Sequence, residues 1–346
     1  MIKVGIVGCG HMGDIHLSLL RGMRNIHVVG IADQDLERAR GLASKSKVEV
    51  VAANLETLLE RAKPDVVHIL TPPFNHASLA CTALQAGCHV YVEKPMALTS
   101  QEARSMATAA ADGKRLLTVG YNNMFSPVVR EARRRVDEGY VGRLVGVDVF
   151  HGALPIHAPW IHKLPSGAWF NDVDHLLYLS RLFMGDAEAV RAIGFPSADK
   201  ARVDEVHLAL RHAGGWSSLT YSTGAAPFQI RIALFGDQRI VEVDVISEIM
   251  VARRSFDMHP WLRKGAMSVH VASQLLSRTG WQALRVLTGH ERAWGGLRSL
   301  MEAFYGAIIE TAPSPVPLDQ CLRIVELKEE IVRLLNESRD GRAGYQ

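Results

Sequence analysis

The sequence predicts an α/β protein in which a doubly wound parallel sheet forms the N-terminal domain. An α+β domain with an open, mainly antiparallel sheet is expected to follow it. Three observations support this fold class. Apolar, β-branched runs alternate with amphipathic segments over the first 120 residues, a glycine-rich turn follows the first run, and later runs alternate with a period of two. We therefore expect one domain over residues 1–120 and a second over residues 121–346.

The expected strands of the first domain are short and rich in valine, isoleucine and leucine, as strands buried on both faces are. They cover Lys3–Val7, Val28–Ala32, Val48–Val51, Val66–Leu70, His89–Val92 and Leu116–Val119. Amphipathic helices are expected between them, over Leu36–Leu42, Leu55–Ala62, His76–Ala86 and Gln101–Ala111. Gly87 is typical of a helix end, and Thr99 with Glu102 is typical of a capping box.

A glycine-rich turn, Gly8-Cys9-Gly10-His11-Met12-Gly13, joins the first strand to a helix. Gly8 permits a tight turn, Gly10 lets the backbone approach a pyrophosphate, and Gly13 lets the helix pack close to the strand. The helix begins at His11 and Met12, so its N-terminal N–H groups and positive dipole end face the phosphates. In this context the turn predicts a Rossmann domain that binds a dinucleotide.

Asp33 follows Gly13 by twenty residues, at the end of the second expected strand. A carboxylate at this place accepts hydrogen bonds from both ribose hydroxyls and repels a 2′-phosphate. We therefore expect NAD as the cofactor, with NADP as the less favoured alternative. The competing interpretation is that Asp33 only caps the helix that starts near Asp35.

Composition excludes several other classes of protein. The net charge is +3 over 346 residues with basic and acidic residues interspersed, so we expect no nucleic-acid partner. No apolar run approaches the ~20 residues that span a bilayer, and we expect no membrane partner. The N-terminus lacks the features of a secretory signal, and the four cysteines have no disulfide-framework spacing. These features predict a cytoplasmic protein.

Two further motifs extend the argument: Thr71-Pro72-Pro73-Phe74-Asn75-His76 follows the fourth strand, and Glu93-Lys94-Pro95 follows the fifth. Together with the glycine turn, they resemble the glucose–fructose oxidoreductase/inositol dehydrogenase (Gfo/Idh/MocA) family. The resemblance covers the N-terminal domain and continues less closely through the second. It implies that Thr71, Pro72, His76 and Glu93 help to bind the cofactor, and that Lys94 lies beside the nicotinamide.

The resemblance also implies that Lys94 takes part in proton transfer at the substrate hydroxyl or carbonyl. Physical chemistry permits this role. A lysine desolvated at the carboxyl edge of a parallel sheet has a lowered pKa and can hydrogen-bond a reacting oxygen. The competing interpretation is a surface lysine paired with Glu93, but Pro95 fixes the local backbone and favours a shaped site.

In the second domain, the segment from Ser166 to Tyr178 resembles the family's helix in which an Asp and a His four residues later face the substrate. Here Asn171 and His175 take these places, and positions four apart share a helix face. The segment departs from the family twice, because Asn171 and Tyr178 replace acidic residues. Asn171 cannot act as a base, so we expect it to orient the substrate hydroxyl while His175 and Lys94 handle the proton.

Two alternatives accompany this assignment. His175 could be a satisfied core histidine, which is the usual role of a lone buried histidine. We also expect Asp172 and Asp174 to point away from the face shared by Asn171 and His175.

The remaining strands of the second domain are expected over Leu144–Phe150, Val206–Arg211, Ser217–Tyr221, Gln229–Phe235 and Arg239–Val245, after a helix from Ser126 to Glu138 that ends at Gly139. Tyr121 and Asn122 follow the last strand of the first domain and are candidate substrate contacts. Trp160 and His162 are candidates too, because a tryptophan among polar residues suits stacking on a sugar ring. His157 and His162 lack a third ligand, so we assign no metal.

The segment from Met258 to His290 contains four Lys and Arg residues, no acidic residue, and apolar residues at helical spacing. We interpret it as a helical insertion near residues 258–300 that packs on the sheet or on a second subunit. The alternative is an interfacial helix near anionic lipid. Closing helices are expected over Ala303–Ile309 and Leu322–Leu335.

Taken together, the motifs predict an NAD(P)-dependent dehydrogenase or reductase that acts on a CH–OH group of a sugar, sugar nucleotide or cyclitol. A homodimer or homotetramer is expected. One alternative is a net non-redox reaction with recycled NAD, as in relatives that cleave glycosides. Another is a dinucleotide-binding sensor whose catalytic centre has decayed, which the replacements at Asn171 and Tyr178 keep open.

Overall fold

The computed structural model describes residues 1–154, 158–196, 203–288 and 294–339. By internal contacts, the chain divides into two compact units. The first is Met1–Tyr121 with Leu300–Glu329, and the second is Asn122–Ser299 with Glu330–Gln346. The stretch Leu300–Glu329 therefore groups with the first unit, whereas the sequence assigned everything after residue 120 to the second domain. The division by function stays a prediction. Over the described residues, no helix is both long and apolar enough to cross a membrane.

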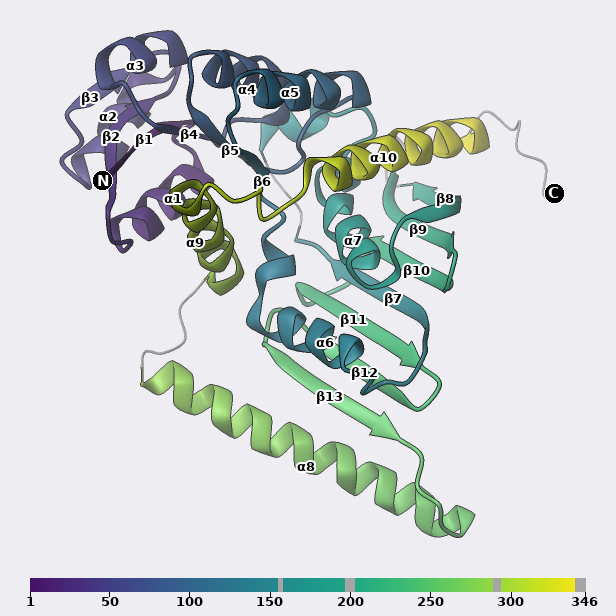
Figure 1. Cartoon of the computed structure of the whole chain (residues 1–346). Coiled ribbons are helices and arrows are strands. Elements are labelled where there is room, and N and C mark those ends of the chain that lie inside the picture. The colour runs from purple at the N-terminus through teal and green to yellow at the C-terminus, as the bar shows by residue number, and fades with distance from the viewer. Residues whose placement is uncertain (155–157, 197–202, 289–293, 340–346) are drawn as a thin grey trace. The chain divides into compact units, whose positions relative to one another are not determined.

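The first unit holds a six-stranded parallel sheet in the order β3-β2-β1-β4-β5-β6 (Figure 1). This order reverses direction next to β1, as in a doubly wound dinucleotide-binding fold, and confirms the predicted fold class. The strands are β1 (Ile2–Val7), β2 (Ile26–Ala32), β3 (Val50–Ala52), β4 (Val66–Ile69), β5 (His89–Val92) and β6 (Leu117–Val119). All six predicted strands are present, and only their ends differ.

The helices of this unit agree with the predicted ones to within two residues at each end between β2 and β6, whereas the closing helix predicted from Ala303 begins eight residues earlier, at Gly295. They are α1 (His11–Arg21), α2 (Leu36–Ser44), α3 (Leu55–Ala62), the 3₁₀ turn η1 (Pro73–Asn75), α4 (His76–Gln85) and α5 (Ser100–Asp112), with parts of α9 (Gly295–Glu310) and α10 (Leu318–Arg339). Thr99 and Glu102 form both bonds of the predicted capping box. Gly87 has a φ of +85° just past α4, which confirms it as a helix-ending glycine.

The second unit holds a seven-stranded sheet in the order β13-β12-β11-β7-β10-β9-β8, antiparallel except for the β7–β10 pair. The strands are β7 (Leu144–Gly152), β8 (Ala187–Pro196), β9 (Val203–His212), β10 (Gly215–Ser222), β11 (Gln229–Gly236), β12 (Arg239–Asp244) and β13 (Ile249–Arg254). The predicted open, mainly antiparallel sheet is confirmed. Both edge strands, β8 and β13, were missed, because an edge strand is half-exposed and its apolar pattern is weak.

The second unit also holds helices and 3₁₀ turns. They comprise the 3₁₀ turns η2 (Asn122–Phe125) and η3 (Pro159–Lys163), α6 (Pro127–Asp137), α7 (Ala168–Met184) and α8 (Pro260–Leu287). α7 packs on β7, β9 and β10, and α6 packs on β12 and β13. In α7 every residue from Trp169 to Ser180 is buried except His175, which is half-exposed. The packing of α7 thus fixes the position of one histidine at the boundary of the core.

Candidate cofactor site and catalytic cluster

The glycine turn has the geometry that a dinucleotide requires. Gly8 has a φ of +102°, and a Cβ there would lie 2.7–2.9 Å from backbone atoms of Leu70 and Thr71. A Cβ on Gly13 would lie 2.6 Å from the Gly8 carbonyl oxygen. Gly10, by contrast, is exposed, and a Cβ on it would meet nothing within 4 Å. Gly8 and Gly13 are therefore needed by the turn itself, whereas Gly10 leaves open space where a ligand's phosphates can approach the backbone.

The residues that begin α1 complete this cradle. Gly10 is the N-cap of α1 and makes no side-chain cap, and His11 and Met12 are the first two residues of the helix. No carboxylate or hydroxyl of the N-cap therefore competes with a phosphate for the end of the helix dipole. The residues present fit a dinucleotide pyrophosphate.

Asp33 lies between the turn and the second strand. Its Oδ2 accepts a hydrogen bond from Cys9 N–H at 2.7 Å, and its Oδ1 accepts one from Asp35 N–H at 2.9 Å. The cap of α2 is Asp35, which accepts from the N–H groups of Glu37 and Arg38. The interpretation of Asp33 as the helix cap is therefore wrong. Its carboxylate instead ties the end of β2 to the glycine turn.

This contact also affects the thiol of Cys9. Burial, with a smaller contribution from the Asp33 carboxylate, raises the pKa of Cys9 to about 12. The thiol stays protonated near neutral pH, so Cys9 is not a reactive nucleophile.

His76 joins the two motif loops of the first unit. One ring nitrogen, Nδ1, lies 2.9 Å from the Pro95 carbonyl oxygen, and the other, Nε2, lies 2.8 Å from the Thr71 carbonyl oxygen. Burial lowers the pKa of His76. Because both nitrogens face carbonyls of the chain, His76 holds the loop of Thr71 and Pro72 against the loop of Lys94.

The hydroxyl of Thr71 has a different environment. Its Oγ1 is buried without a hydrogen-bond partner among the residues that the structure describes. Such an atom in a native protein calls for a partner, and a bound ligand is one that would serve.

Glu93 is a buried carboxylate at the end of β5. Its Oε2 accepts the main-chain N–H of Lys94 at 3.2 Å, and its Oε1 lies 3.2 Å from His16 Nε2. The next peptide, Lys94–Pro95, is cis, and Lys94 is half-buried. The Glu93 carboxylate thus holds the backbone of Lys94 in place.

A chain of buried side chains continues from Glu93. His16 Nδ1 lies 2.8 Å from His68 Nδ1, and His68 Nε2 lies 2.7 Å from the hydroxyl of Tyr305 in α9. A carboxylate only accepts, so His16 donates through Nε2–H, His68 donates through Nδ1–H, and Tyr305 donates its O–H. Burial and His16 hold the pKa of His68 well below its usual value, and burial raises that of Tyr305. His68 and Tyr305 therefore stay neutral, and every donor in the row has an acceptor.

The second cluster surrounds His175. Its Nδ1 lies 2.5 Å from the Tyr178 hydroxyl and 3.2 Å from Asn123 Nδ2, while the N–H of Asn123 donates to the Tyr178 oxygen at 3.3 Å. The His175 ring meets that of His151 edge-on at 5.4 Å. The imidazole is therefore held at Nδ1 by Tyr178, one of the two residues at which this sequence departs from the family.

Asn171, one helical turn before His175, makes a hydrogen bond to the next residue of the helix. Its Nδ2–H donates to Asp172 Oδ1 at 2.8 Å, and Asp172 Oδ2 lies 3.5 Å from the Tyr221 hydroxyl. The prediction that Asp172 points away from this face is wrong for its carboxylate. Near the start of a helix the wheel places the Cβ atoms correctly, but adjacent short side chains can still bend toward each other.

The other predicted substrate contacts are less closely defined. Tyr121 is fully buried, and Asn122 has a buried Oδ1 without a hydrogen-bond partner among the described residues. Trp160 is half-exposed in η3. The side chain of His162 and all of His157 lie outside the described residues. Across the described ranges, no group of three His, Cys, Asp or Glu residues is arranged to hold a metal ion.

Several of these residues were missed from sequence. His16, His68 and Tyr305 gave no signal, because Tyr305 lies 237 residues from His68 in the chain. Asn123 directly follows Asn122, which was a predicted substrate contact. His151 lies on a strand that was predicted, but nothing in the sequence paired it with His175.

Both units match one family in sequence. Residues 2–121 match the oxidoreductase family with an NAD-binding Rossmann fold, and residues 129–242 match the GFO/IDH/MocA C-terminal domain. The chain belongs to the Gfo/Idh/MocA oxidoreductase family. This confirms the resemblance seen in the motifs.

Curated relatives share parts of the chain. Inositol 2-dehydrogenase 1 of Saccharopolyspora erythraea is 35% identical over 43% of this chain and 45% of its own length. D-glucoside 3-dehydrogenase of Escherichia coli is 31% identical over 41% of each chain. The chain thus spans less than half the length of these two relatives.

Among solved structures, the WlbA dehydrogenase from Bordetella pertussis, in complex with NADH and UDP-GlcNAcA, has a TM-score of 0.80. The match covers 98% of this chain and 97% of that one at 21% identity. At this identity the likeness supports the fold of both units.

Proposed function

We propose that this Gfo/Idh/MocA protein moves a hydride between NAD and a carbinol or carbonyl carbon of a sugar, sugar nucleotide or cyclitol. The observation that carries the proposal is the glycine turn, in which Gly10 borders open space while Gly8 and Gly13 are required by packing. The family and the named dehydrogenase activities of its relatives support the substrate class.

Asp33 favours NAD over NADP. Each of its oxygens accepts one backbone N–H, and a carboxylate oxygen can accept a second hydrogen bond, so ribose hydroxyls can still bind. A 2′-phosphate would instead bring like charge to the carboxylate. Thr71, Pro72, Glu93 and the start of α1 would hold the rest of the cofactor. When bound, NAD supplies or accepts the hydride.

We propose that Lys94 and His175 act on the proton of the substrate hydroxyl. Tyr178 accepts the Asn123 N–H, which leaves its own O–H suited to donate to His175 Nδ1. A neutral His175 then carries its proton on Nε2 and can donate a hydrogen bond from it to the substrate oxygen. The proton itself would pass between that oxygen and Lys94: the ammonium gives it to the carbonyl oxygen during reduction, and the resulting amine takes it back from the hydroxyl in the reverse direction.

Asn171 receives a revised role in this proposal. It still lies one helical turn before His175, but its amide donates to Asp172, so we place it as a positioning residue for the cluster. Asn122, with its buried Oδ1, and Trp160, with its half-exposed ring, are the proposed contacts for substrate hydroxyls and a ring face.

The test is a turnover assay on a panel of sugars, sugar nucleotides and cyclitols, followed in both directions by NADH absorbance and product analysis. We expect net NADH formation or consumption with at least one panel member. A changed product without net NADH change would indicate the NAD-recycling alternative. NADH binding without turnover of any member in either direction would contradict the proposal and favour a sensor, which the loss of acidic residues at Asn171 and Tyr178 allows.

Two further expectations belong to the same proposal. We expect a homodimer or homotetramer in solution, and a cytoplasmic location. The four cysteines are free thiols, three of them buried, which is compatible with a reducing compartment.

A further inference from the structure

The helix α8 is the longest in the second unit and has no buried residue over its 28 residues. It lies along β13, the edge strand of the seven-stranded sheet (Figure 1). It carries four Lys and Arg residues and no acidic residue. A helix of this kind normally turns its apolar side to the protein and its charges to water.

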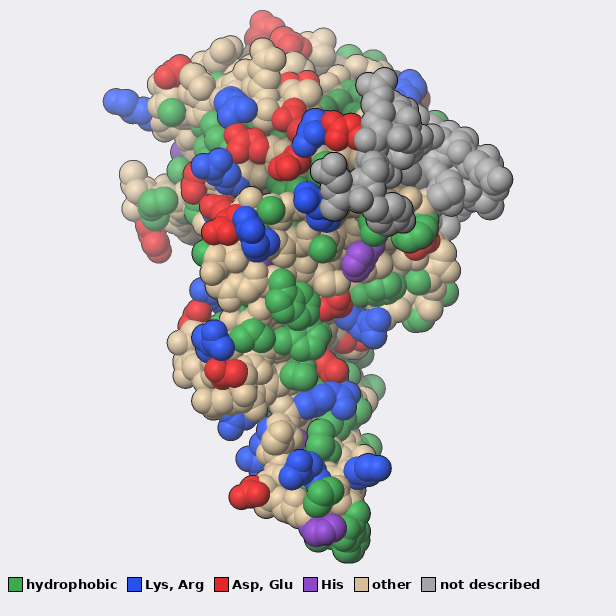
Figure 2. All heavy atoms as spheres, turned by 90° about the vertical axis from the view of Figure 1, so that its right-hand side faces the viewer, with side chains coloured by type: hydrophobic (Ala, Val, Ile, Leu, Met, Phe, Trp, Pro, Cys, Tyr) green, Lys and Arg blue, Asp and Glu red, His purple; other side chains and the backbone are tan. Residues whose placement is uncertain are grey.

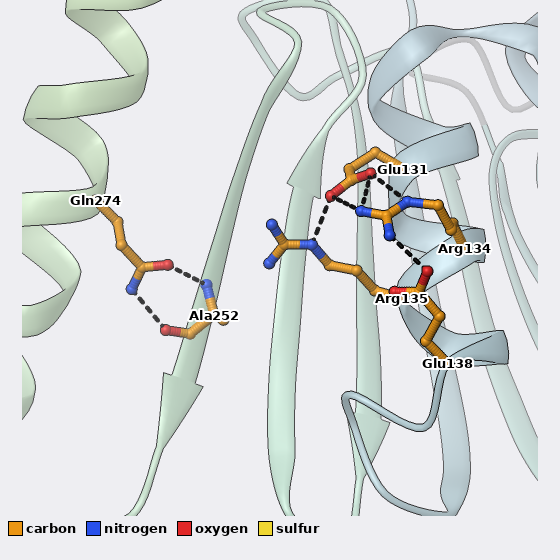
Figure 3. Close-up of polar contacts among 6 residues, drawn as sticks. All are labelled: Glu131, Arg134, Arg135, Glu138, Ala252 and Gln274. Carbon is orange, nitrogen blue, oxygen red and sulfur yellow. Dashed lines mark hydrogen bonds and ion pairs between the residues drawn. The ribbon is translucent and has the colours of Figure 1, made fainter.

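In α8 the polar side faces the protein. The side-chain amide of Gln274 makes two bonds to the backbone of Ala252 in β13: Ala252 N–H donates to Oε1 at 3.0 Å, and Nε2 donates to the Ala252 carbonyl at 2.8 Å (Figure 3). One turn earlier, the ring of His270 meets that of Phe256 at 5.5 Å. Gln274 thus replaces a neighbouring strand at an edge where N–H and C=O groups need polar partners.

The basic residues in the second half of α8 lie on the same side. Arg285 pairs with Glu248 at 4.0 Å. Arg278 is one turn after Gln274, and burial, together with the charge of Arg135 in α6, lowers its pKa. Figure 3 shows that Arg135 and Glu131 lie beside the sheet strands. The charges of this half are therefore directed toward the protein's own sheet and α6.

The opposite side of α8 is uncharged and apolar. Leu262, Val269 and Leu276, each seven residues apart, have 48%, 69% and 76% of their surface exposed. Figure 2 shows hydrophobic side chains at the surface at the lower end of the molecule, where α8 begins. We call this side the apolar stripe; its members are Leu262, Gly265, Val269, Ala272, Leu276, Thr279, Ala283 and Val286.

The spacing of the apolar stripe is that of a helix pair. Its members alternate steps of three and four residues over almost four heptads, the a and d pattern of helices that pack in parallel or antiparallel pairs. Gly265 and Ala272 are small residues that allow a second helix to come close. At 1.5 Å per residue the helix is about 42 Å long, enough for an interface near the standard size of roughly 800 Å² per partner.

We propose that the apolar stripe of α8 packs against the apolar stripe of α8 in a second copy of this chain, across a two-fold axis. A stripe without charge on one copy meets the same uncharged stripe on the other, so self-pairing brings no like charges together. A helix that lies on anionic lipid would show its basic residues around its apolar side. Here Arg285 instead pairs with Glu248 of the second unit, and Arg278 is half-buried one turn after Gln274.

The test measures molecular mass by size-exclusion chromatography with light scattering. Leu276→Glu places a charge in the middle of the stripe, and we expect it to halve the mass of the wild-type oligomer. Ser277→Glu adds the same charge to the adjacent, exposed residue outside the stripe, and we expect it to keep the wild-type mass. Far-ultraviolet circular dichroism and NADH titration of each variant report whether the fold is intact. A single-chain mass for the wild type, or an unchanged mass for Leu276→Glu, would overturn the proposal.

A second measurement does not depend on a disruptive change. Ala272→Cys, near the middle of the stripe, should give a covalent dimer with a short bis-maleimide, whereas Ser277→Cys should give little. An equal yield from both variants would contradict the pairing. Flotation with phosphatidylcholine–phosphatidylserine vesicles tests whether the apolar stripe binds a lipid surface instead. Flotation of wild type and Ser277→Glu but not of Leu276→Glu would assign the stripe to lipid and overturn the proposal, and no flotation would support it.

Discussion

At the scale of single residues, the partner of His175 Nδ1 decides the chemistry of the His175 cluster. Tyr178 lies at 2.5 Å from His175 Nδ1, where the family carries an acidic residue. A phenol O–H can donate to Nδ1 of a neutral imidazole, whereas a carboxylate can only accept. The residue that partners Nδ1 therefore decides which ring nitrogen holds the proton.

This reasoning predicts the effect of Tyr178→Asp. A carboxylate beside Nδ1 stabilises the imidazolium and raises the pKa of His175. The limb of the pH–activity profile that reflects the titration of His175 should therefore move to higher pH by about one unit or more. Tyr178→Phe, which removes the hydroxyl without adding charge, is the matched control and should not move the limb upward. The measurement is the pH dependence of kcat/KM. Identical profiles for all three proteins would show that His175 does not titrate in the reaction.

Asn171→Asp restores the family residue, but the structure predicts a loss rather than a gain. Its new carboxylate would lie beside that of Asp172, where the two groups are now joined by a 2.8 Å hydrogen bond in a buried setting. Like charges raise the pKa of one carboxyl in the folded state, so the folded protein binds more protons than the unfolded chain and its stability falls as pH rises.

We expect Asn171→Asp to lower the free energy of unfolding by about 2 kcal/mol near neutral pH, and less at pH 5. Urea unfolding at the two pH values measures both. A variant as stable as wild type at neutral pH would mean that Asn171 and Asp172 are not in contact in solution.

At the scale of elements, the buried row Tyr305–His68–His16–Glu93 links α9, β4, α1 and the end of β5 within the first unit. Burial lowers the pKa of His68 in this row, and it also lowers the pKa of His76, which lies outside the row in the same unit. In the unfolded chain these two histidines take up a proton near pH 6.5, whereas in the folded protein they do so only at lower pH. Stability from this row is therefore present above about pH 6.5 and is lost as pH falls below it.

The free energy of unfolding should decrease between pH 7 and pH 5 in wild type. His68→Gln should flatten this slope, because one of the buried histidines that resists protonation is gone. His259→Gln, at an exposed position, is the control and should keep the wild-type slope. Urea midpoints at each pH give the comparison. Equal slopes in wild type and His68→Gln would show that His68 is accessible to protons in the folded protein.

Helices and strands were predicted from the sequence more successfully than contacts between side chains. Six strands and the capping box at Thr99 followed from local patterns, because buried parallel strands are continuous apolar runs and a cap is set within four residues. The edge strands β8 and β13 were missed, since they alternate weakly. The partners of His175 and of Glu93 came from contacts between distant segments, which no local pattern encodes.

At the scale of the whole molecule, the two units carry different parts of the proposed activity. The first has the glycine turn, Asp33 and Lys94, and the second has the His175 cluster. Their sequences match the two domains of one family, and under the proposed function both parts serve one reaction. Substitutions in the first unit at Asp33 should therefore change the preference between NADH and NADPH, and substitutions in the His175 cluster should change turnover.

Asp33→Ser tests this separation from the cofactor side. Wild type should bind NADH more tightly than NADPH, and the variant should narrow the gap because the charge that opposes a 2′-phosphate is removed. Fluorescence titrations of both cofactors at one ionic strength give the two Kd values. NADPH binding as tight as NADH binding in wild type would contradict the role given to Asp33.

The central claim is that Lys94 and His175 act on the same reacting oxygen. The most direct measurement is the steady-state rate of Lys94→Ala, His175→Ala and the double variant with a substrate found in the panel, together with NADH affinity. Each single change should lower kcat by about 10²-fold or more with little change in NADH affinity. The double variant should lose less than the product of the two factors, because groups that serve one proton are not additive. Wild-type turnover in His175→Ala, or a fully multiplicative loss in the double variant, would contradict the account.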